Sequence, residues 1–254
     1  MCDRSPRCTV IRMRLAKLAL VAAALPLAVL TRWDAPARER PPEHRTPSTA
    51  AARPAAARPD VVSRAAWGAD EKLVRERAPY VTRVSAVFVH HTSHPDAYDC
   101  ADTPRIMRAL QQQHVHRMGW DDVGYNYVVD RCGTVYAGRV DHAGRPLRGA
   151  HATGFNARSV GIAALGDFRE GARVPRAMLA SIAAVAAWQL RPGADPHGRV
   201  RLVSTNSDSR YPKGAAALLH TISGHRDGFE TACPGEALYA KLPRLRDDVA
   251  RRRW

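Results

Sequence analysis

The sequence predicts an α/β domain in which a single mixed central β-sheet is flanked by about three helices. Two short, continuously apolar runs at residues 86–90 and 159–165 are typical of strands buried on both faces. Two longer segments, between Asp102 and Gly119 and between Val174 and Arg191, repeat apolar side chains with the period of a helix. Strands and helices alternate along the chain, and this order favours helices packed against one sheet.

Three regions of different composition divide the chain. Residues 1–37 are expected to be a secretory signal peptide, because basic residues precede an apolar run at 18–30 that is too short to span a membrane comfortably. The alternative is an uncleaved N-terminal anchor. Residues 38–60 are rich in proline, alanine and arginine and predict a disordered linker. Residues 61–254 are predicted to form the folded domain.

The first half of the domain has recognisable element boundaries. We expect residues 61–68 to pack Trp67 onto the core. Asp102 is expected to cap a helix, since Thr103-Pro104 follows it and proline favours the first helical position. Gly119 is expected to end that helix. Residues 124–139 then predict a hairpin with a tight turn at Arg131-Cys132-Gly133.

The second half alternates in the same way. The segment that starts at Val174-Pro175 predicts the second helix. Residues 194–219 are expected to be irregular, apart from a short strand at 200–203. A strand is expected at 218–222, followed by a final helical segment that is interrupted at Pro243.

The formal net charge of +15 is spread unevenly. Residues 1–60 hold eleven Lys and Arg against five Asp and Glu, which gives +6 and leaves +9 for the remainder. A basic surface suits nucleic acid, anionic lipid or an acidic cell-wall polymer. The sequence lacks a zinc finger, a P-loop and an aromatic-basic stripe, so we expect no nucleic-acid partner. No later segment resembles a membrane span, so we expect no stable membrane insertion after signal removal.

The cysteine count indicates how the thiols are used. Cys2 and Cys8 would leave with the signal peptide, so three cysteines remain in an oxidising compartment where disulfides persist. Three is an odd number. Cys233 follows His225 at a spacing that suits a metal site, so we expect a disulfide between Cys100 and Cys132.

Histidine and cysteine residues suggest one metal centre. His225 and Cys233 are separated by seven residues, and a loop of that length can aim both side chains at one point. Imidazole nitrogen and thiolate sulfur are preferred zinc ligands. His90 ends a predicted strand, so it is expected at the sheet edge where His225 also lies. His114 and His116 cannot share a metal, because residues two apart on a helix point in different directions.

Four stretches together resemble a known family: VFVHHTS (87–93), GWDDVGYNYVVDRCGTVYAGR (119–139), GAHATGFNARSVGIAALGDF (149–168) and TISGHRDGFETACPG (221–235). They are similar to the peptidoglycan recognition proteins and type 2 N-acetylmuramoyl-L-alanine amidases, a family that includes an amidase-type bacteriophage lysozyme. The secreted, proline-linked layout is most similar to actinobacterial members.

The resemblance implies a site and an activity. His90, His225 and Cys233 would bind Zn²⁺, and a zinc-activated water would hydrolyse the amide bond between N-acetylmuramic acid and L-alanine. Tyr125 matches the catalytic tyrosine of the family, and Thr231 matches a second active-site position. His151 and Asn156 match the loop that lines the groove for the peptide stem. The resemblance also implies a monomer that is secreted, is associated with the cell wall and binds peptidoglycan.

Each of these roles has a simpler alternative. His90 and His225 would otherwise be a strand-end and a turn histidine. Cys233 would be a free buried thiol or a disulfide partner, and Tyr125 a packing residue. Thr231 would otherwise be a loop hydroxyl and His151 a surface histidine. The alternative function is a peptidoglycan-binding recognition module without catalysis.

Overall fold

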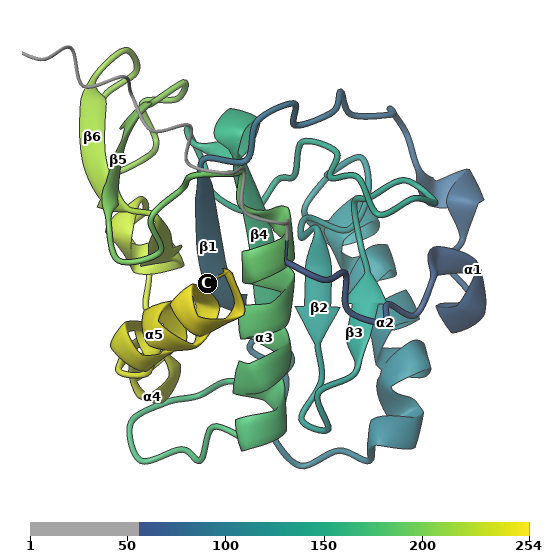
Figure 1. The fold of residues 1–254 in the computed structure, drawn as a ribbon. Helices are drawn as coiled ribbons and strands as arrows, with labels where there is room; N and C mark the ends of the chain where they lie inside the picture. Colours follow the sequence, from purple (N-terminus) through teal and green to yellow (C-terminus); the bar gives the residue numbers. More distant parts are fainter. Residues whose placement is uncertain (1–55, 254) are drawn as a thin grey trace, which may run out of the picture. The chain divides into compact units, whose positions relative to one another are not determined.

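The computed structural model describes residues 56–253, and a five-stranded sheet lies at the centre of this part (Figure 1). The expected signal peptide and most of the expected linker lie outside the described residues. The spatial order of the strands is β3-β2-β4-β1-β7, and only β3 runs antiparallel to its neighbour. The predicted mixed central sheet is confirmed. Its strands are β1 (Ala86–His91), β2 (Tyr127–Val129), β3 (Val135–Ala137), β4 (Ser159–Ala164) and β7 (Ile222–Gly224).

Helices cover both faces of the sheet. The long helices α3 (Arg176–Gln189) and α5 (Leu242–Arg253) contact each other over one face, as Figure 1 shows. Helix α2 (Thr103–Gln112) packs in a separate apolar cluster with side chains of β2 and β4. The expectation of about three flanking helices is confirmed. Two short helices, α1 (Arg64–Trp67) and α4 (Glu236–Tyr239), complete the set.

Strand β1 divides its side chains between the two faces. Val87 and Val89 belong to the core cluster beneath α3 and α5, whereas Phe88 packs in a second cluster with Phe155. Because successive side chains of a strand point to opposite faces, His90 shares the face of Phe88. The alternation therefore directs His90 away from α3 and α5.

Residues 194–220 are more regular than the sequence predicted. Strands β5 (Arg199–Val203) and β6 (Ala216–His220) form a separate antiparallel ribbon. The short strand expected at 200–203 is confirmed, whereas the irregular structure expected after it was wrong where β6 forms. The strand expected at 218–222 is also wrong in its bounds. Thr221 separates β6 from β7, and its amide donates to the carbonyl of Gly198. The ribbon forms because one of its faces buries Leu202 and Leu219 against Phe155.

The helical segment that contains α2 begins and ends where predicted, but its start is capped differently. The side chain of Asp102 makes no capping hydrogen bond, so its expected capping role was wrong. Asp99 instead caps a preceding 3-10 turn (Cys100–Asp102) by accepting from the amide of Ala101 at 2.9 Å. Beyond α2, a π-helical turn (Gln113–Arg117) leads to Gly119, whose φ of 71° ends the helix as predicted.

The hairpin between β2 and β3 is held at its turn by a buried carboxylate. Cys132 in this turn forms the predicted disulfide with Cys100. Asp130 accepts hydrogen bonds from the amides of Cys132 and Thr134, both at 2.9 Å. Trp67 packs on the core as predicted, with its indole donating to the carbonyl of Ala137 at 2.8 Å.

No helix among residues 56–253 is long and apolar enough to cross a membrane. At the C-terminal end, the predicted interruption near Pro243 is confirmed, since α4 ends at Tyr239 and α5 begins at Leu242.

Candidate metal centre

Strand register brings His90 and His225 together. Val89 of β1 lies opposite Gly224 of β7 in a parallel pair, so the next residue of each strand reaches the same level of the sheet. These next residues are His90 and His225, and their ring centroids are 4.5 Å apart. The convergence expected at the carboxyl ends of these strands therefore occurs.

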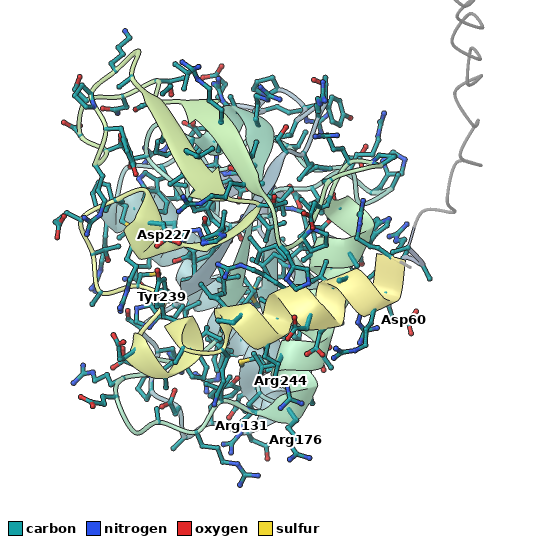
Figure 2. All side chains as sticks on the ribbon, turned by 60° about the vertical axis from the view of Figure 1, so that its left-hand side comes forward. Asp60, Arg131, Arg176, Asp227, Tyr239 and Arg244 are labelled. Carbon is teal, nitrogen blue, oxygen red and sulfur yellow. A yellow bond between two sulfur atoms is a disulfide. The ribbon has the colours of Figure 1, made fainter. Side chains whose placement is uncertain are left out.

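The loop between His225 and Cys233 folds back on itself. The amide of Arg226 donates to the carbonyl of Cys233 at 3.0 Å and closes the loop. At its start, Asp227 accepts from the amide of Gly224 at 2.9 Å and from the hydroxyl of Tyr239 at 2.6 Å (Figure 2). These bonds fix the chain on both sides of the turn that carries His225. The seven-residue spacing thus places both side chains at one point.

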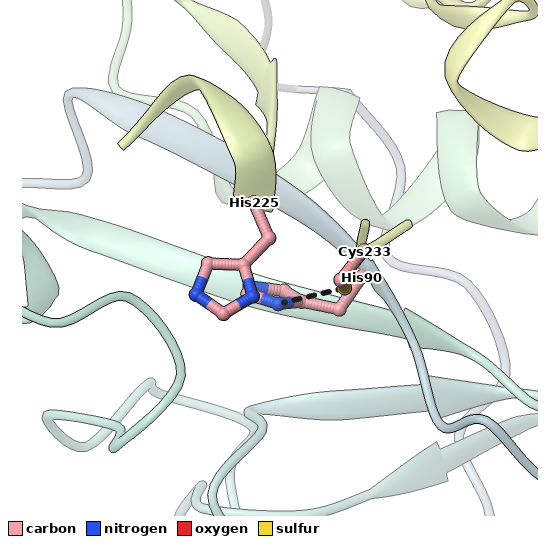
Figure 3. Close-up of side chains that lie close together, drawn as sticks. All are labelled: His90, His225 and Cys233. Carbon is pink, nitrogen blue, oxygen red and sulfur yellow. Dashed lines mark hydrogen bonds between the residues drawn. The ribbon is translucent and has the colours of Figure 1, made fainter. Parts of the chain in front are cut away.

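Figure 3 shows the three side chains that converge there. One donor atom from each of His90, His225 and Cys233 lies within 4.8 Å of the others. Nδ1 of His90 is 3.7 Å from Sγ of Cys233. Zinc bonds of about 2.3 Å to sulfur and 2.0–2.1 Å to nitrogen separate such atoms by about 3.6 Å in a tetrahedral site. The donor set and its spacing therefore fit Zn²⁺.

The three donors differ in exposure. His90 is 1% exposed and Cys233 is 7% exposed, whereas His225 is only partly buried. His225 is therefore the most exposed member of a largely buried cluster. A set of three protein donors, which leaves the fourth tetrahedral position to water, is typical of a catalytic rather than a structural zinc site.

Burial sets the protonation of these donors. It lowers the pKa of His225 to about 4 and lowers the pKa of His90 well below its ordinary value, with a further decrease from neighbouring histidines. Both rings are therefore neutral at pH 7 and have a free lone pair. Burial also raises the pKa of the Cys233 thiol to about 12. A bound cation would reverse that preference, because it stabilises the thiolate.

His91 and Asp167 support the cluster without belonging to it. The backbone amide of His91 donates to Sγ of Cys233 at 3.3 Å. The ring of His91 points elsewhere, with Nδ1 located 2.5 Å from the carbonyl oxygen of Asp167 and 3.6 Å from its carboxylate. The choice of His90 over His91 as the inward-facing histidine agrees with this geometry. The role of Asp167 was not predicted, and no local pattern in the sequence signals it.

Tyr125 and Thr231 both lie beside the cluster. The ring of Tyr125 is 5.3 Å from that of His90, and its hydroxyl donates to the carbonyl of His91 at 3.3 Å. Burial raises the pKa of Tyr125, so the phenol keeps its proton at pH 7. The hydroxyl of Thr231 accepts from the amide of Cys233 at 3.1 Å. Both residues contact the segments that carry the proposed ligands, and their catalytic roles stay predictions.

His151 and Asn156 lie in one loop. His151 contacts His90 of β1, and Asn156 contacts the backbone of its own loop. Nδ1 of His151 is 3.1 Å from Nε2 of His90, and His151 is 4% exposed. The side-chain oxygen of Asn156 accepts from the amides of His151 and Ala152, at 3.0 and 2.9 Å. The alternative of a surface position for His151 is wrong. Substrate contact by either residue stays a prediction.

The family model described as N-acetylmuramoyl-L-alanine amidase matches residues 80–236, which include every residue of this site. The chain belongs to the N-acetylmuramoyl-L-alanine amidase family. The predicted relationship to peptidoglycan recognition proteins and type 2 amidases is confirmed.

Known relatives include both recognition proteins and amidases. The chain is 35% identical over 110 residues to peptidoglycan-recognition protein 2 of Holotrichia diomphalia, covering 43% of this chain and 55% of that protein. It is 32% identical over 189 residues to the human N-acetylmuramoyl-L-alanine amidase, covering 70% of this chain and 27% of that protein. The chain thus spans about half the length of the Holotrichia protein and about a quarter of the length of the human amidase.

The fold also matches a solved family structure. A point mutant of Drosophila PGRP-LB in complex with tracheal cytotoxin superposes with a TM-score of 0.53 at 26% identity. The match covers 72% of this chain and 92% of that one. It supports the observed arrangement of sheet and helices for this member of the amidase family.

Proposed function

We propose that this family member is a secreted, zinc-dependent N-acetylmuramoyl-L-alanine amidase. It would hydrolyse the amide bond between N-acetylmuramic acid and L-alanine in peptidoglycan. The observation that carries the proposal is the convergence of His90, His225 and Cys233 within 4.8 Å on one edge of the sheet. Membership of the amidase family supplies the substrate class.

The chain's own residues would hold the metal and maintain its ligands. His90, through Nδ1, His225 and Cys233 provide two nitrogens and one sulfur, and the amide of His91 stabilises the thiolate. When bound, zinc lowers the pKa of a water ligand and polarises a carbonyl oxygen. The neutral state of both histidines keeps their lone pairs available at pH 7.

Tyr125 is the proposed hydrogen-bond donor to the reacting carbonyl. Negative charge develops on the amide oxygen during hydrolysis, and a fixed neutral donor stabilises that charge. The raised pKa of Tyr125 keeps its proton in place, and its hydroxyl lies beside the ligand-bearing end of β1. Thr231 is the proposed second group, because its hydroxyl lies two residues from Cys233 in the same loop.

The substrate is proposed to be a muramyl peptide. The structure of the related PGRP-LB mutant contains tracheal cytotoxin. We propose that the loop of His151 and Asn156 lines the groove for the peptide stem, with the side-chain NH₂ of Asn156 directed to the substrate. Its side-chain oxygen is already used by two backbone amides.

The proposal extends to the whole chain. Residues 1–37 would direct secretion, residues 38–60 would act as a linker, and residues 61–254 would act as a monomeric enzyme. A basic groove between α3 and α5 supports cell-wall association through anionic polymers. It has a volume of about 560 Å³ and contains one carboxylate, Asp248. Its cations are Arg176, Lys241, Arg244, Arg251 and Arg252, two of which are labelled in Figure 2.

A digestion experiment tests the amidase proposal against binding without catalysis. The purified protein is incubated with a muramyl peptide after chelator treatment, with and without added zinc. We expect new free N-terminal L-alanine only with zinc. If the protein binds the peptide but releases no L-alanine, the recognition-module function is correct instead.

A further inference from the structure

His90 has two ring nitrogens, and both have a neighbour. Nδ1 faces Cys233 at 3.7 Å, and Nε2 lies 3.1 Å from Nδ1 of His151. A neutral imidazole that binds a metal through Nδ1 carries its hydrogen on Nε2. In that state His90 donates to His151, and Nδ1 of His151 is the acceptor.

We propose that His151 is a positioning residue for the zinc site. By accepting the Nε2 hydrogen of His90, it selects the tautomer of His90 that presents Nδ1 to the metal. This inference rests on the zinc site of the proposed function. It assigns the ring of His151 to the metal site and leaves the groove-lining role proposed above to the rest of its loop. Outer hydrogen bonds of this kind orient metal-binding imidazoles and increase metal affinity.

The ring of His151 occupies a slot that two glycines leave open. A β-carbon on Gly161 of β4, or on Gly149, would overlap the imidazole. Neither glycine has a positive φ. At Gly161 the close approach of the ring is the feature that requires glycine, whereas at Gly149 the carbonyl oxygen of Gly124 also leaves no room for a β-carbon. The amide of His151 is bound in addition by the side chain of Asn156. The ring is therefore held between Gly149 and Gly161, and the backbone that carries it is fixed by Asn156.

The remaining polar atom of His151 favours the same role. Nε2 is buried and has no hydrogen-bond partner among residues 56–253. Among residues 56–253, the ring of His151 therefore makes one hydrogen bond, the one between its Nδ1 and Nε2 of His90. A buried polar group without a partner is costly, so its retention indicates a function for the ring. Because the atom is inaccessible, direct contact with a peptide stem does not account for it.

The test uses two replacements of nearly equal size in the full-length protein. His151→Asn keeps an acceptor oxygen near the position of Nδ1, whereas His151→Leu removes it. Chelator-treated proteins are titrated with zinc against a competing chelating dye. We expect the zinc Kd of His151→Leu to rise by about 10- to 100-fold and that of His151→Asn to stay within about threefold of wild type.

Two further variants separate positioning from general stability. Gly161→Ala displaces the ring without removing it, and we expect a similar rise in the zinc Kd. His114→Asn changes another buried histidine, with no hydrogen bond to the proposed ligands, and should leave the Kd unchanged. The urea midpoint of each metal-free variant, and the visible spectrum of its cobalt form, show whether the fold or the coordination has changed.

The outcomes are distinct. Equal zinc Kd values for His151→Asn and His151→Leu would overturn the inference and leave the zinc amidase proposal intact. Weaker binding of muramyl peptide by metal-free His151→Leu, with an unchanged zinc Kd, would restore the groove-lining role. A wild-type protein that binds no zinc would overturn both proposals.

Discussion

The backbone amide of His91 donates a hydrogen bond to Sγ of Cys233 across 3.3 Å, although 142 positions separate the two residues. The strand that supplies one proposed ligand thus also supports another. Amide donors stabilise a thiolate more than a thiol, because the charged acceptor makes the stronger hydrogen bond. The arrangement therefore favours Cys233 as a metal ligand rather than an inert buried thiol.

Replacing Cys233 should remove the metal. We expect wild-type protein to bind about one zinc per chain and Cys233→Ser to bind little, because serine provides no thiolate. Amidase activity should be lost together with the zinc, whereas binding of the muramyl peptide should persist. Elemental analysis and a peptide-binding titration measure these effects. Full zinc content in Cys233→Ser would contradict the ligand assignment.

Replacing Tyr125 should slow the reaction without removing zinc. Tyr125→Phe deletes the hydroxyl that we assign to the reacting carbonyl, and loss of such a donor reduces kcat by about 10²- to 10³-fold. KM and zinc content should change little. Steady-state assays of L-alanine release measure the effect.

Tyr127→Phe is the matched control for this variant. Its hydroxyl donates to the carbonyl of Gly144 at 2.7 Å within the core cluster of α3, so it should change stability rather than rate. An unchanged kcat for Tyr125→Phe would show that Tyr125 is only a packing residue.

The sequence is sufficient to bring two proposed ligands to the same sheet edge because their signals are local. His90 lies near the end of β1 and His225 directly follows β7, and these parallel strands end at the same edge. The spacing of Cys233 is similarly local. The resemblance to family motifs then selects His90 rather than His91. The structure agrees, because the ring of His90 faces Cys233 and the ring of His91 faces Asp167.

Other features depend on contacts that no local pattern encodes. Strands β5 and β6 form because Leu202 and Leu219 are covered by Phe155, and the outward side of β5 carries Arg199 and Arg201. The sequence therefore predicts the strand at 200–203 but not its pairing with β6, because that pairing depends on contacts with a distant loop. The contact between His90 and His151 is similarly invisible, because it depends on how a distant loop meets β1.

Removing the disulfide should destabilise the domain without affecting the site. Cys100 and Cys132 are 32 positions apart, and a cross-link closing such a loop stabilises by about 3–4 kcal/mol in the chain-entropy model. We expect the double Cys100→Ser and Cys132→Ser variant to lose this amount in urea unfolding. Its zinc content should equal that of wild type, which distinguishes it from Cys233→Ser. A loss below about 1 kcal/mol would show that the hairpin turn is held mainly by Asp130.

The stability of the metal-free protein should fall as the pH falls from about 6.5 to 4. Burial lowers the pKa of His114 to about 4, and its Nδ1 accepts from the amide of Gly124 at 2.9 Å. In this window the unfolded chain binds a proton that the folded state excludes, so the free energy of unfolding decreases with decreasing pH. One such histidine contributes a slope of up to about 1.4 kcal/mol per pH unit.

His114→Asn isolates this contribution, since asparagine can accept from Gly124 but does not titrate. We expect urea unfolding of this variant, measured at intervals between pH 4 and 7, to depend less steeply on pH than that of wild type. His116→Asn is the control, because His116 is exposed when the protein is folded and when it is unfolded. Its slope should match wild type. A wild-type slope in His114→Asn would show that protonation of His114 does not oppose folding, and the loss at low pH would then come from His225 and the other buried histidines, whose pKa values burial also lowers.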